Sequence, residues 1–322
     1  MDWITEAVIA TTGHVNLVAV SNYRFWLNRI EYPFAHREFD SGEGWMNYVD
    51  EGVGRPVVFV HGSMTWSFLF RRFIEEVSQT HRCIAPDHLG FGLSDKPADG
   101  DYWPEGHARR FAKFMDSLNL RDVTLVLHDA GAPFALEWAA QNPDRVRDIV
   151  LFNSFVWDLK DNAPAMMLAK NISNPVNKVY YRILQATPSF ILPPLFADRY
   201  RMSKAIQRQY LRPFETHSER IGVYTMVESW KKSGEWFESL RPKLDVLASK
   251  RVMLVWGTKD PMFGKEALLR MQEIFPEAIT HEFPESGRFL PEEQSAKVTG
   301  EIQWFLLNSG NPSFAVFEQL GG

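Results

Sequence analysis

The stretch "VLHDAGAPFALEW" (residues 126–138) decides how this chain is expected to fold. A short apolar run ends at one acidic residue, Asp129, and small residues then open a pattern with helical spacing. Gly131 and Ala132 allow a strand and a helix to approach closely, so Asp129 is predicted to stand exposed on a sharp strand-to-helix bend. A carboxylate held there can attack carbon and form an ester. The alternative, which the stretch alone leaves open, is that Asp129 caps the helix.

Short apolar runs rich in β-branched residues recur on both sides of this bend, and helical patterns separate them. This alternation predicts an α/β fold with a mostly parallel, doubly wound sheet. Strands are expected at 45–52, 56–62, 83–87, 123–129, 146–153, 251–257 and 278–283.

The alternation of predicted strands and helices stops between residues 155 and 236, where the sequence has helical patterns, many aromatic residues and many prolines. This segment is too long and too apolar for a bare loop. We predict that 155–236 is a helical cap inserted into a core made of residues 1–154 and 237–322, and that it folds over the carboxyl edge of the sheet.

The composition of the chain excludes several kinds of protein. The chain has 322 residues, of which 45% are hydrophobic and 23% charged, as in a globular protein with a large core. Its net charge of −5 disfavours nucleic acid as a partner. The single cysteine, Cys83, lies in an apolar run and is expected to be a buried thiol. No apolar run is long enough to span a membrane, so no stable membrane insertion and a cytoplasmic location are expected.

Two further motifs flank the bend. "HGSMTWSFLFR" (61–71) follows a predicted strand and opens a helix, so the Ser63 N–H is expected to pair with the Ala130 N–H to form an oxyanion hole. "WGTKDPMF" (256–263) places Asp260 just after a later strand. Since carboxyl ends of parallel strands share one edge, Asp260 should approach Asp129. The alternative is that Asp260 has only a structural role, as a turn residue before Pro261.

Together, "VHGSMTWSFLFR", "PDHLGFGLSDKP", "HDAGAPFALEWA" and "WGTKDP" resemble the haloalkane dehalogenase and epoxide hydrolase branch of the α/β-hydrolases. The resemblance covers nearly all of the chain after residue 40. It implies the α/β-hydrolase fold with a helical cap, Asp129 as nucleophile and Asp260 as the acid that orients the base. Beside the resemblance, we predict that His61, His128, Trp157 and Phe289 lie around the substrate pocket, Trp157 because it follows a strand and would face the cap. No cofactor is expected, and no pair of histidines or cysteines has metal-ligand spacing.

The chain departs from this branch beside the nucleophile. Dehalogenases of this type usually carry Trp where this chain has Ala130, and often Asn where it has Ser63. Without those two donors a departing halide is poorly stabilised, which disfavours dehalogenation. Epoxide opening needs a proton donor, and the predicted cap offers tyrosines, although most are expected to serve packing. They are Tyr180, Tyr181, Tyr200, Tyr210 and Tyr224.

The largest departure is Arg288, in "PESGRFLPEEQ" (284–294), where the resemblance implies a catalytic histidine. Arginine keeps its proton and cannot accept another, so ester hydrolysis would lose its base. Three interpretations stay open. Arg288 pairs with Asp260, Asp129 or both in an inactive site. Alternatively, it binds a substrate carboxylate or stabilises an anionic transition state in non-hydrolytic chemistry, or it is an engineered or selected change that stops turnover.

The sequence therefore predicts an enzyme with an aspartate nucleophile, of the haloalkane dehalogenase and epoxide hydrolase type, with impaired or altered turnover. The expected partner is a small apolar organic substrate, and a homodimer is left open. The alternatives are a non-hydrolytic rearrangement, cyclisation or elimination that uses Asp129 and Arg288, and a ligand-binding protein without catalysis.

Overall fold

The computed structural model describes residues 25–177, 197 and 202–308. Its centre is an eight-stranded sheet in the order β1-β2-β4-β3-β5-β6-β7-β8. Strands β1 and β2 are antiparallel to their neighbours, and all other pairs are parallel. The strands are β1 (Arg37–Asp40), β2 (Trp45–Glu51), β3 (Pro56–Val60), β4 (Arg82–Pro86), β5 (Val123–Asp129), β6 (Val146–Ser154), β7 (Arg251–Gly257) and β8 (Ile279–Phe283).

Every strand that the sequence predicted is present within a residue or two of its expected ends. The central strands β3 and β5 are almost wholly buried, which explains their continuous apolar runs. The edge strand β1 was not predicted, because it is short and mostly exposed and so carries no apolar pattern. Cys83 is buried on β4, as expected, and burial raises the pKa of its thiol.

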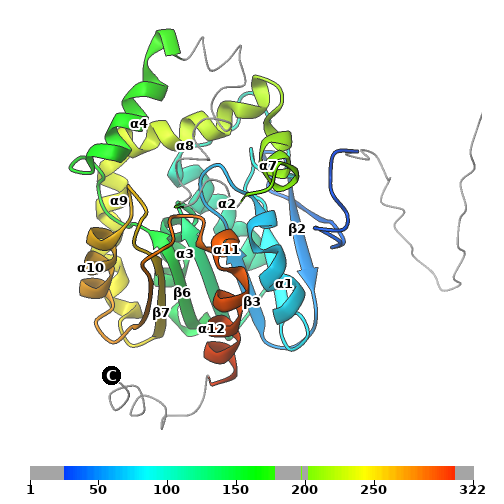
Figure 1. Ribbon diagram of the computed structural model, residues 1–322, viewed down its shortest axis with the longest axis vertical. Coiled ribbons are helices and arrows are strands. Elements are labelled where there is room, and N and C mark those ends of the chain that lie inside the picture. Colours follow the sequence, from blue (N-terminus) through cyan, green and yellow to red (C-terminus); the bar gives the residue numbers. More distant parts are fainter. Residues whose placement is uncertain (1–24, 178–196, 198–201, 309–322) are drawn as a thin grey trace, which may run out of the picture.

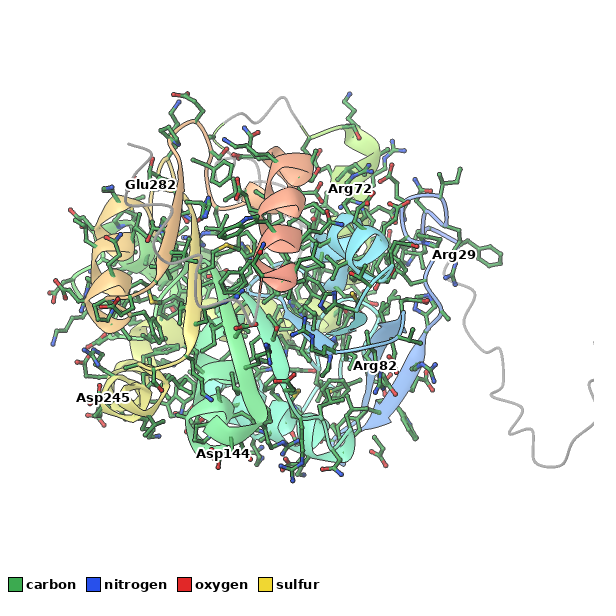
Figure 2. The ribbon with its side chains drawn as sticks, turned by 90° about the horizontal axis from the view of Figure 1, so that it is seen from below. Arg29, Arg72, Arg82, Asp144, Asp245 and Glu282 are labelled. Carbon is green, nitrogen blue, oxygen red and sulfur yellow. The ribbon has the colours of Figure 1, made fainter. Side chains whose placement is uncertain are left out.

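Helices cover both faces of the sheet. Helix α1 (Arg71–Val77) packs beside α12 (Ser295–Leu307) on one face, and α2 (Pro104–Ser117) packs with α3 (Gly131–Gln141) on the other (Figure 1). Helix α10 (Lys265–Ile274) connects β7 to β8. In the view of Figure 2, charged side chains such as Asp144 and Asp245 lie at the outside of the molecule. No helix in the described ranges is long and apolar enough to cross a membrane.

The segment between β6 and β7 lies over the carboxyl edge of the sheet. Figure 1 shows α4 (Ala163–Ser173), α7 (Lys204–Leu211) and α8 (Ile221–Lys232) above that edge. Hydrogen bonds tie this segment to the loops that follow the strands: Trp66 donates to the Gln209 carbonyl, and Asn162 donates to the Met262 carbonyl.

One predicted boundary lies within a helix of the structure. The break expected after residue 236 falls inside α9 (Gly234–Leu240). This helix packs against α3, and its Phe237 ring lies 5.0 Å from the Phe155 ring, so the helix is continuous through the predicted break. The division of the chain into core and cap remains a prediction.

Candidate active site

Asp129 lies at the bend where β5 ends and α3 begins, as the sequence predicted. Its φ of +51° is a left-handed conformation that is rare for a residue with a side chain and costs about 1–3 kcal/mol. Two glycines allow the bend. A Cβ at Gly62 would lie 2.4 Å from the Asp129 Cβ, and a Cβ at Gly131 would lie 2.3 Å from the His61 carbonyl oxygen. The structure therefore places a strained acidic residue between two close backbone approaches.

Replacement of Gly131 should test this bend. Gly131→Ala is expected to destabilise the protein by about 1–3 kcal/mol, because the new methyl group meets buried backbone that cannot move. The matched control is Gly300→Ala in α12, where no atom lies within 4 Å and the helix should gain about 0.5–1 kcal/mol. Urea unfolding measures both, and equal midpoints for the two variants would contradict the expected crowding at Gly131.

The Asp129 side chain is fully buried and only partly satisfied. Its Oδ2 accepts a hydrogen bond from the Ser63 N–H at 3.1 Å and lies 3.9 Å from Nη1 of Arg288, and the Ala130 N–H also bonds the carboxylate. Oδ1 has no hydrogen-bond partner. Burial raises the pKa of Asp129 to about 6, against the opposing effect of Arg288. Asp129 is therefore mainly ionised at neutral pH and keeps one oxygen available.

Asp260 and Arg288 form a buried ion pair beside Asp129. Arg288 donates from Nε to Asp260 Oδ2 at 3.1 Å and from Nη2 to Oδ1 at 3.2 Å. Asp260 follows β7, and its Oδ1 also accepts from the Met262 N–H. Burial opposes the charge on Arg288, but Asp260 and Asp129 outweigh it and raise the pKa of the guanidinium. Arg288 is thus a permanent cation in contact with both acids.

The loop that carries Arg288 is fixed from three sides. The Phe263 ring lies under the guanidinium, with its centre 4.4 Å from Cζ. His128 Nε2 contacts the Arg288 carbonyl oxygen at 3.0 Å, and the Gly287 N–H donates to Glu293 at 2.8 Å. These contacts hold Arg288 in one place, so its position does not depend on the Asp260 pair alone.

The arrangement has two buried carboxylates, Asp129 and Asp260, and a cation, Arg288, that contacts both of them. In hydrolases that use three such groups, the bridging group takes a proton from the attacking group or from water. An arginine cannot do this, since it has no lone pair. Arg288 therefore cannot act as the proton acceptor at this position.

Comparison with known proteins identifies the same fold that the sheet and the bend indicate. Residues 55–295 match the family model described as the alpha/beta hydrolase fold. The chain belongs to the α/β-hydrolase family.

Relatives of this α/β-hydrolase include enzymes of two kinds. It is 32% identical over 285 residues to a cis-3-alkyl-4-alkyloxetan-2-one decarboxylase of Shewanella oneidensis, covering 85% of this chain and 89% of that protein. It is 33% identical over 275 residues to haloalkane dehalogenase 2 of Mycobacterium tuberculosis, covering 84% and 94%. Among solved structures, haloalkane dehalogenase DatA of Agrobacterium tumefaciens C58 matches with a TM-score of 0.76 and 25% identity, over 86% and 97% of the two chains.

Of the predicted donors and pocket residues of this α/β-hydrolase, some lie next to Asp129 and others pack elsewhere in the structure. Ser63 and Ala130 both direct N–H groups at Asp129, as expected. Phe289 is buried, with its ring 6.1 Å from that of His128. Trp157 lies under the Arg270 guanidinium of α10, at 4.3 Å. The structure therefore places Trp157 with α10, and a pocket role for it stays a prediction.

Of the two histidines near the site, His61 has both ring nitrogens engaged, whereas Nδ1 of His128 has no hydrogen-bond partner. His61 uses Nδ1 on the Gly62 carbonyl and Nε2 on the His88 N–H. His128 uses Nε2 on the Arg288 carbonyl, and burial lowers its pKa to about 4. Of the predicted tyrosines, Tyr180, Tyr181 and Tyr200 lie outside the described residues. Tyr210 donates to Glu292, which already occupies its hydroxyl proton.

Two supporting residues were missed by the sequence analysis. Asn153, at the end of β6, donates to Asp260 Oδ2 at 3.3 Å and exchanges hydrogen bonds with Gly257, so it holds the acid's loop. A polar residue at the carboxyl end of a buried strand is a signal that could have identified it. Glu293 holds the Arg288 loop, and nothing in its helical, solvated-looking sequence context distinguishes it.

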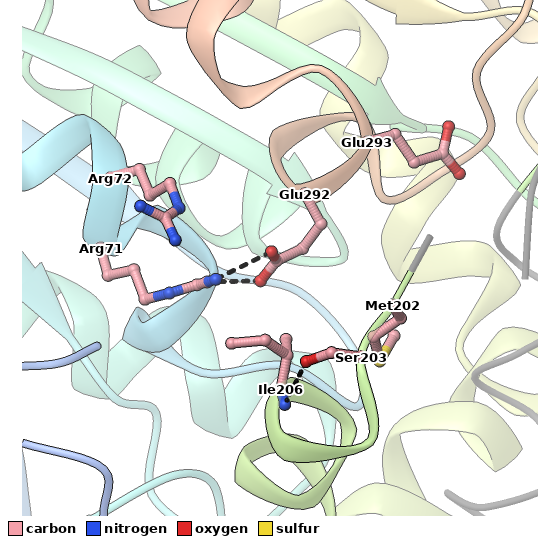
Figure 3. A pocket seen from close by; sticks show the side chains of 7 residues that line it. All are labelled: Arg71, Arg72, Met202, Ser203, Ile206, Glu292 and Glu293. Atoms are coloured by element: carbon pink, nitrogen blue, oxygen red, sulfur yellow. Dashed lines mark hydrogen bonds and ion pairs between the residues drawn. The ribbon is translucent and has the colours of Figure 1, made fainter. Parts of the chain in front are cut away.

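A cavity of about 190 Å³ lies where α1, α7 and α11 (Leu290–Glu293) meet (Figure 3). Its walls include Arg71 and Glu292, which form an ion pair across it, and Glu293, whose carboxylate points away from that pair in Figure 3. Because Glu292 also accepts from Tyr210, this polar network joins the segment above the sheet to the core. No group of acids, histidines or cysteines in the described ranges is placed to hold a metal ion.

The buried histidines of this α/β-hydrolase predict acid sensitivity. Burial lowers the pKa of His61, His88, His107 and His128, the last to about 4. The unfolded chain binds protons on these residues near pH 6.5, whereas the folded chain does not, so stability should fall as pH drops below about 6.5. Asp129 and Asp148 act in the opposite sense, because their raised pKa values let the folded chain bind a proton first, but the histidines with lowered pKa values number five once His81 is included.

We expect each histidine to remove up to about 1.4 kcal/mol of stability per pH unit in this window. Urea unfolding between pH 7 and pH 5 measures the sum. An unfolding midpoint that stays constant or rises over this range would contradict the prediction.

Proposed function

We propose that this protein is an enzyme whose Asp129 carboxylate attacks an apolar electrophile and forms an aspartyl ester, and whose Arg288 slows hydrolysis of that ester. The observation that carries the proposal is the position of Arg288. It pairs through Nε and Nη2 with Asp260 while Nη1 lies 3.9 Å from Asp129. We infer that Arg288 occupies the place of the base histidine in related hydrolases.

The first step needs no base. In the attack, the Asp129 oxygen forms a bond to carbon, the bond from carbon to the leaving group breaks, and the leaving group departs with the electron pair. Asp129 supplies the electrons because its carboxylate is mainly ionised above pH 6. The strained bend and the N–H groups of Ser63 and Ala130 hold the carboxylate in one orientation before the substrate binds.

The second step, hydrolysis, requires a water molecule to lose a proton. General bases typically contribute about 10²–10⁴-fold to such a step. Arg288 accepts no proton, and His61 has both ring nitrogens engaged with backbone groups. The ester is therefore expected to accumulate.

Intact-protein mass spectrometry tests the proposal. Incubation with hexyl bromide or styrene oxide should add one substrate-derived group per chain, and the modification rate should fall as pH drops through about 6, because Asp129 becomes protonated. Asp129→Asn is the control and should remain unmodified. Rapid production of free alcohol without a persistent adduct would contradict impaired hydrolysis. No adduct, together with tight binding of unmodified ligand, would favour the non-catalytic alternative.

A second candidate is the non-hydrolytic removal of CO₂ from an oxetan-2-one, favoured by the decarboxylase relative and by a cation that can hold a carboxylate. Asp129 would displace the ring oxygen from C4 and release a carboxylate on C3. The C2–C3 bond would then break, its electron pair would form the C3=C4 double bond, and the bond between C4 and the Asp129 oxygen would break. The products are an alkene and CO₂, and no water enters. Gas chromatography should detect the alkene, whereas a hydroxy acid as sole product would rule this candidate out.

A further inference from the structure

We propose that the cavity between α1, α7 and α11 is a second binding site, and that it takes a small neutral molecule with an apolar body and one hydroxyl group. The described walls of this cavity do not include Asp129 or Arg288, so the site does not depend on the reaction proposed there. Its volume is about 190 Å³. Because a cavity of about 150 Å³ can hold benzene, this one has room for a molecule of about seven heavy atoms.

The charges in the wall favour a neutral ligand. The wall has two cations, Arg71 and Arg72, and two anions, Glu292 and Glu293, so its charges cancel. Arg71 binds both oxygens of Glu292, and Glu31 accepts hydrogen bonds from both arginines. An anionic ligand would compete with these glutamates for the arginines, and a cationic ligand would be repelled by the two guanidinium groups. Either would also lose hydration on entering.

The polar groups of the wall suit one hydroxyl group. Within the described part of the chain, Glu292 Oε1 accepts two hydrogen bonds, from Arg71 Nη1 and the Tyr210 hydroxyl, whereas Oε2 accepts one, from Arg71 Nη2 at 3.0 Å. A carboxylate oxygen has two lone-pair sites, so Oε2 can accept one more hydrogen bond. The Ser203 hydroxyl accepts from the Ile206 N–H at 3.2 Å and has its own proton to donate. A ligand hydroxyl can therefore donate to Glu292 and accept from Ser203.

The apolar part of the wall lies beside Ser203. Met202 and Ile206 are half-buried, and Figure 3 shows both side chains close to Ser203 at the start of α7. An apolar ligand body placed against them removes their exposed surface from water, which favours binding.

A molecule bound here would bridge two parts of the chain. Its body would contact α7, in the segment between β6 and β7, while its hydroxyl would bond Glu292 on α11. The Tyr210–Glu292 hydrogen bond already joins the same two helices. Because the ligand favours the state in which α7 and α11 are together, it should reduce opening of α7 away from the core.

Methionine methyl groups labelled with ¹³C report on this cavity and on the Asp129 site separately. Met202 lines the cavity, whereas Met64 is buried and follows Ser63, whose N–H bonds Asp129. In an NMR titration, cyclohexanol should shift the Met202 signal saturably, with a Kd on the order of 1 mM for a ligand of this size. Met202→Leu and Met64→Leu assign the two signals. A Met202 signal that does not move, or a response of Met64 alone, would overturn the proposal.

Three further probes with the same ring test the expected chemistry. Cyclohexyl methyl ether cannot donate to Glu292 and should bind about tenfold more weakly than cyclohexanol, the usual effect of losing one hydrogen bond. Cyclohexylammonium and cyclohexanecarboxylate should also bind more weakly, because each carries a charge. If either charged probe binds more tightly than cyclohexanol, the site does not select a neutral hydroxyl compound.

Ile206→Trp should fill the cavity and abolish binding, whereas the matched control Leu269→Trp, at a half-exposed position on α10, should leave binding unchanged. Hydrogen exchange provides the second measurement. At a cyclohexanol concentration of ten times Kd, exchange of α7 amides that depends on opening should slow by about tenfold in the wild type and the control, but not in Ile206→Trp. Unchanged cyclohexanol affinity in folded Ile206→Trp, or equal slowing in all three proteins, would show that the ligand binds elsewhere.

Discussion

Arg288→His should increase the rate at which the Asp129 ester is hydrolysed by about 10²–10⁴-fold, the usual contribution of a general base. The imidazole would meet Asp260, which already directs both carboxylate oxygens toward this side chain and is held by Asn153 and the Met262 N–H. The acid is therefore preorganised to orient a base. The rate in this variant should rise with pH as the new histidine loses its proton, since only the neutral imidazole accepts one.

The matched control adds Asp260→Asn to Arg288→His, which should remove most of the gain because the imidazole loses the group that orients it. Single-turnover mass spectrometry follows the decay of a preformed adduct in each variant. If the folded Arg288→His protein loses its adduct no faster than the wild type, Arg288 is not what limits hydrolysis.

Arg288→Met should destabilise the fold by about 3–5 kcal/mol at neutral pH, the typical cost of removing one partner from a buried ion pair. The change leaves Asp129 and Asp260 buried with no cation between them, and like charges at short range in a low-dielectric interior repel strongly. One of the two carboxylates should then take up a proton, so the loss of stability should shrink as pH falls.

Asp260→Asn combined with Arg288→Met should recover part of the lost stability, since it removes one of the two unpaired charges. Urea unfolding of the single and double variants measures the difference. Equal stability of the wild type and the single variant would mean that Arg288 does not hold the two acids together.

Much of the fold could be predicted because buried parallel strands have an unambiguous sequence pattern. The apolar runs of β3, β5, β6 and β7 appear where the sequence placed them. The edge strand β1 could not be seen, because an exposed four-residue strand has no apolar face to mark it. The predicted end of the inserted segment lies inside α9, a continuous helix whose start neither a proline nor a composition change marks.

The site could be predicted at the points where the backbone fixes a side chain. Asp129 and Asp260 follow strands, and their meeting at one edge follows from the sheet alone. The contacts of Arg288 depend on a loop and could not be derived from spacing, which left its three interpretations open. The structure places it against both acids. Trp157 shows the limit of the reasoning, since its position after β6 suggested the pocket but its ring lies under Arg270.

Peptide mapping of the modified protein tests the central claim most directly. Cleavage after Arg121 and Arg145 releases residues 122–145, a peptide that contains Asp129. After exposure to hexyl bromide, the wild type should carry one hexyl group on this peptide, fragmentation should locate it at Asp129, and the group should persist for hours while the Arg288→His adduct disappears. A hexyl group on any other residue, or an Asp129 adduct that decays equally fast in both proteins, would contradict the account.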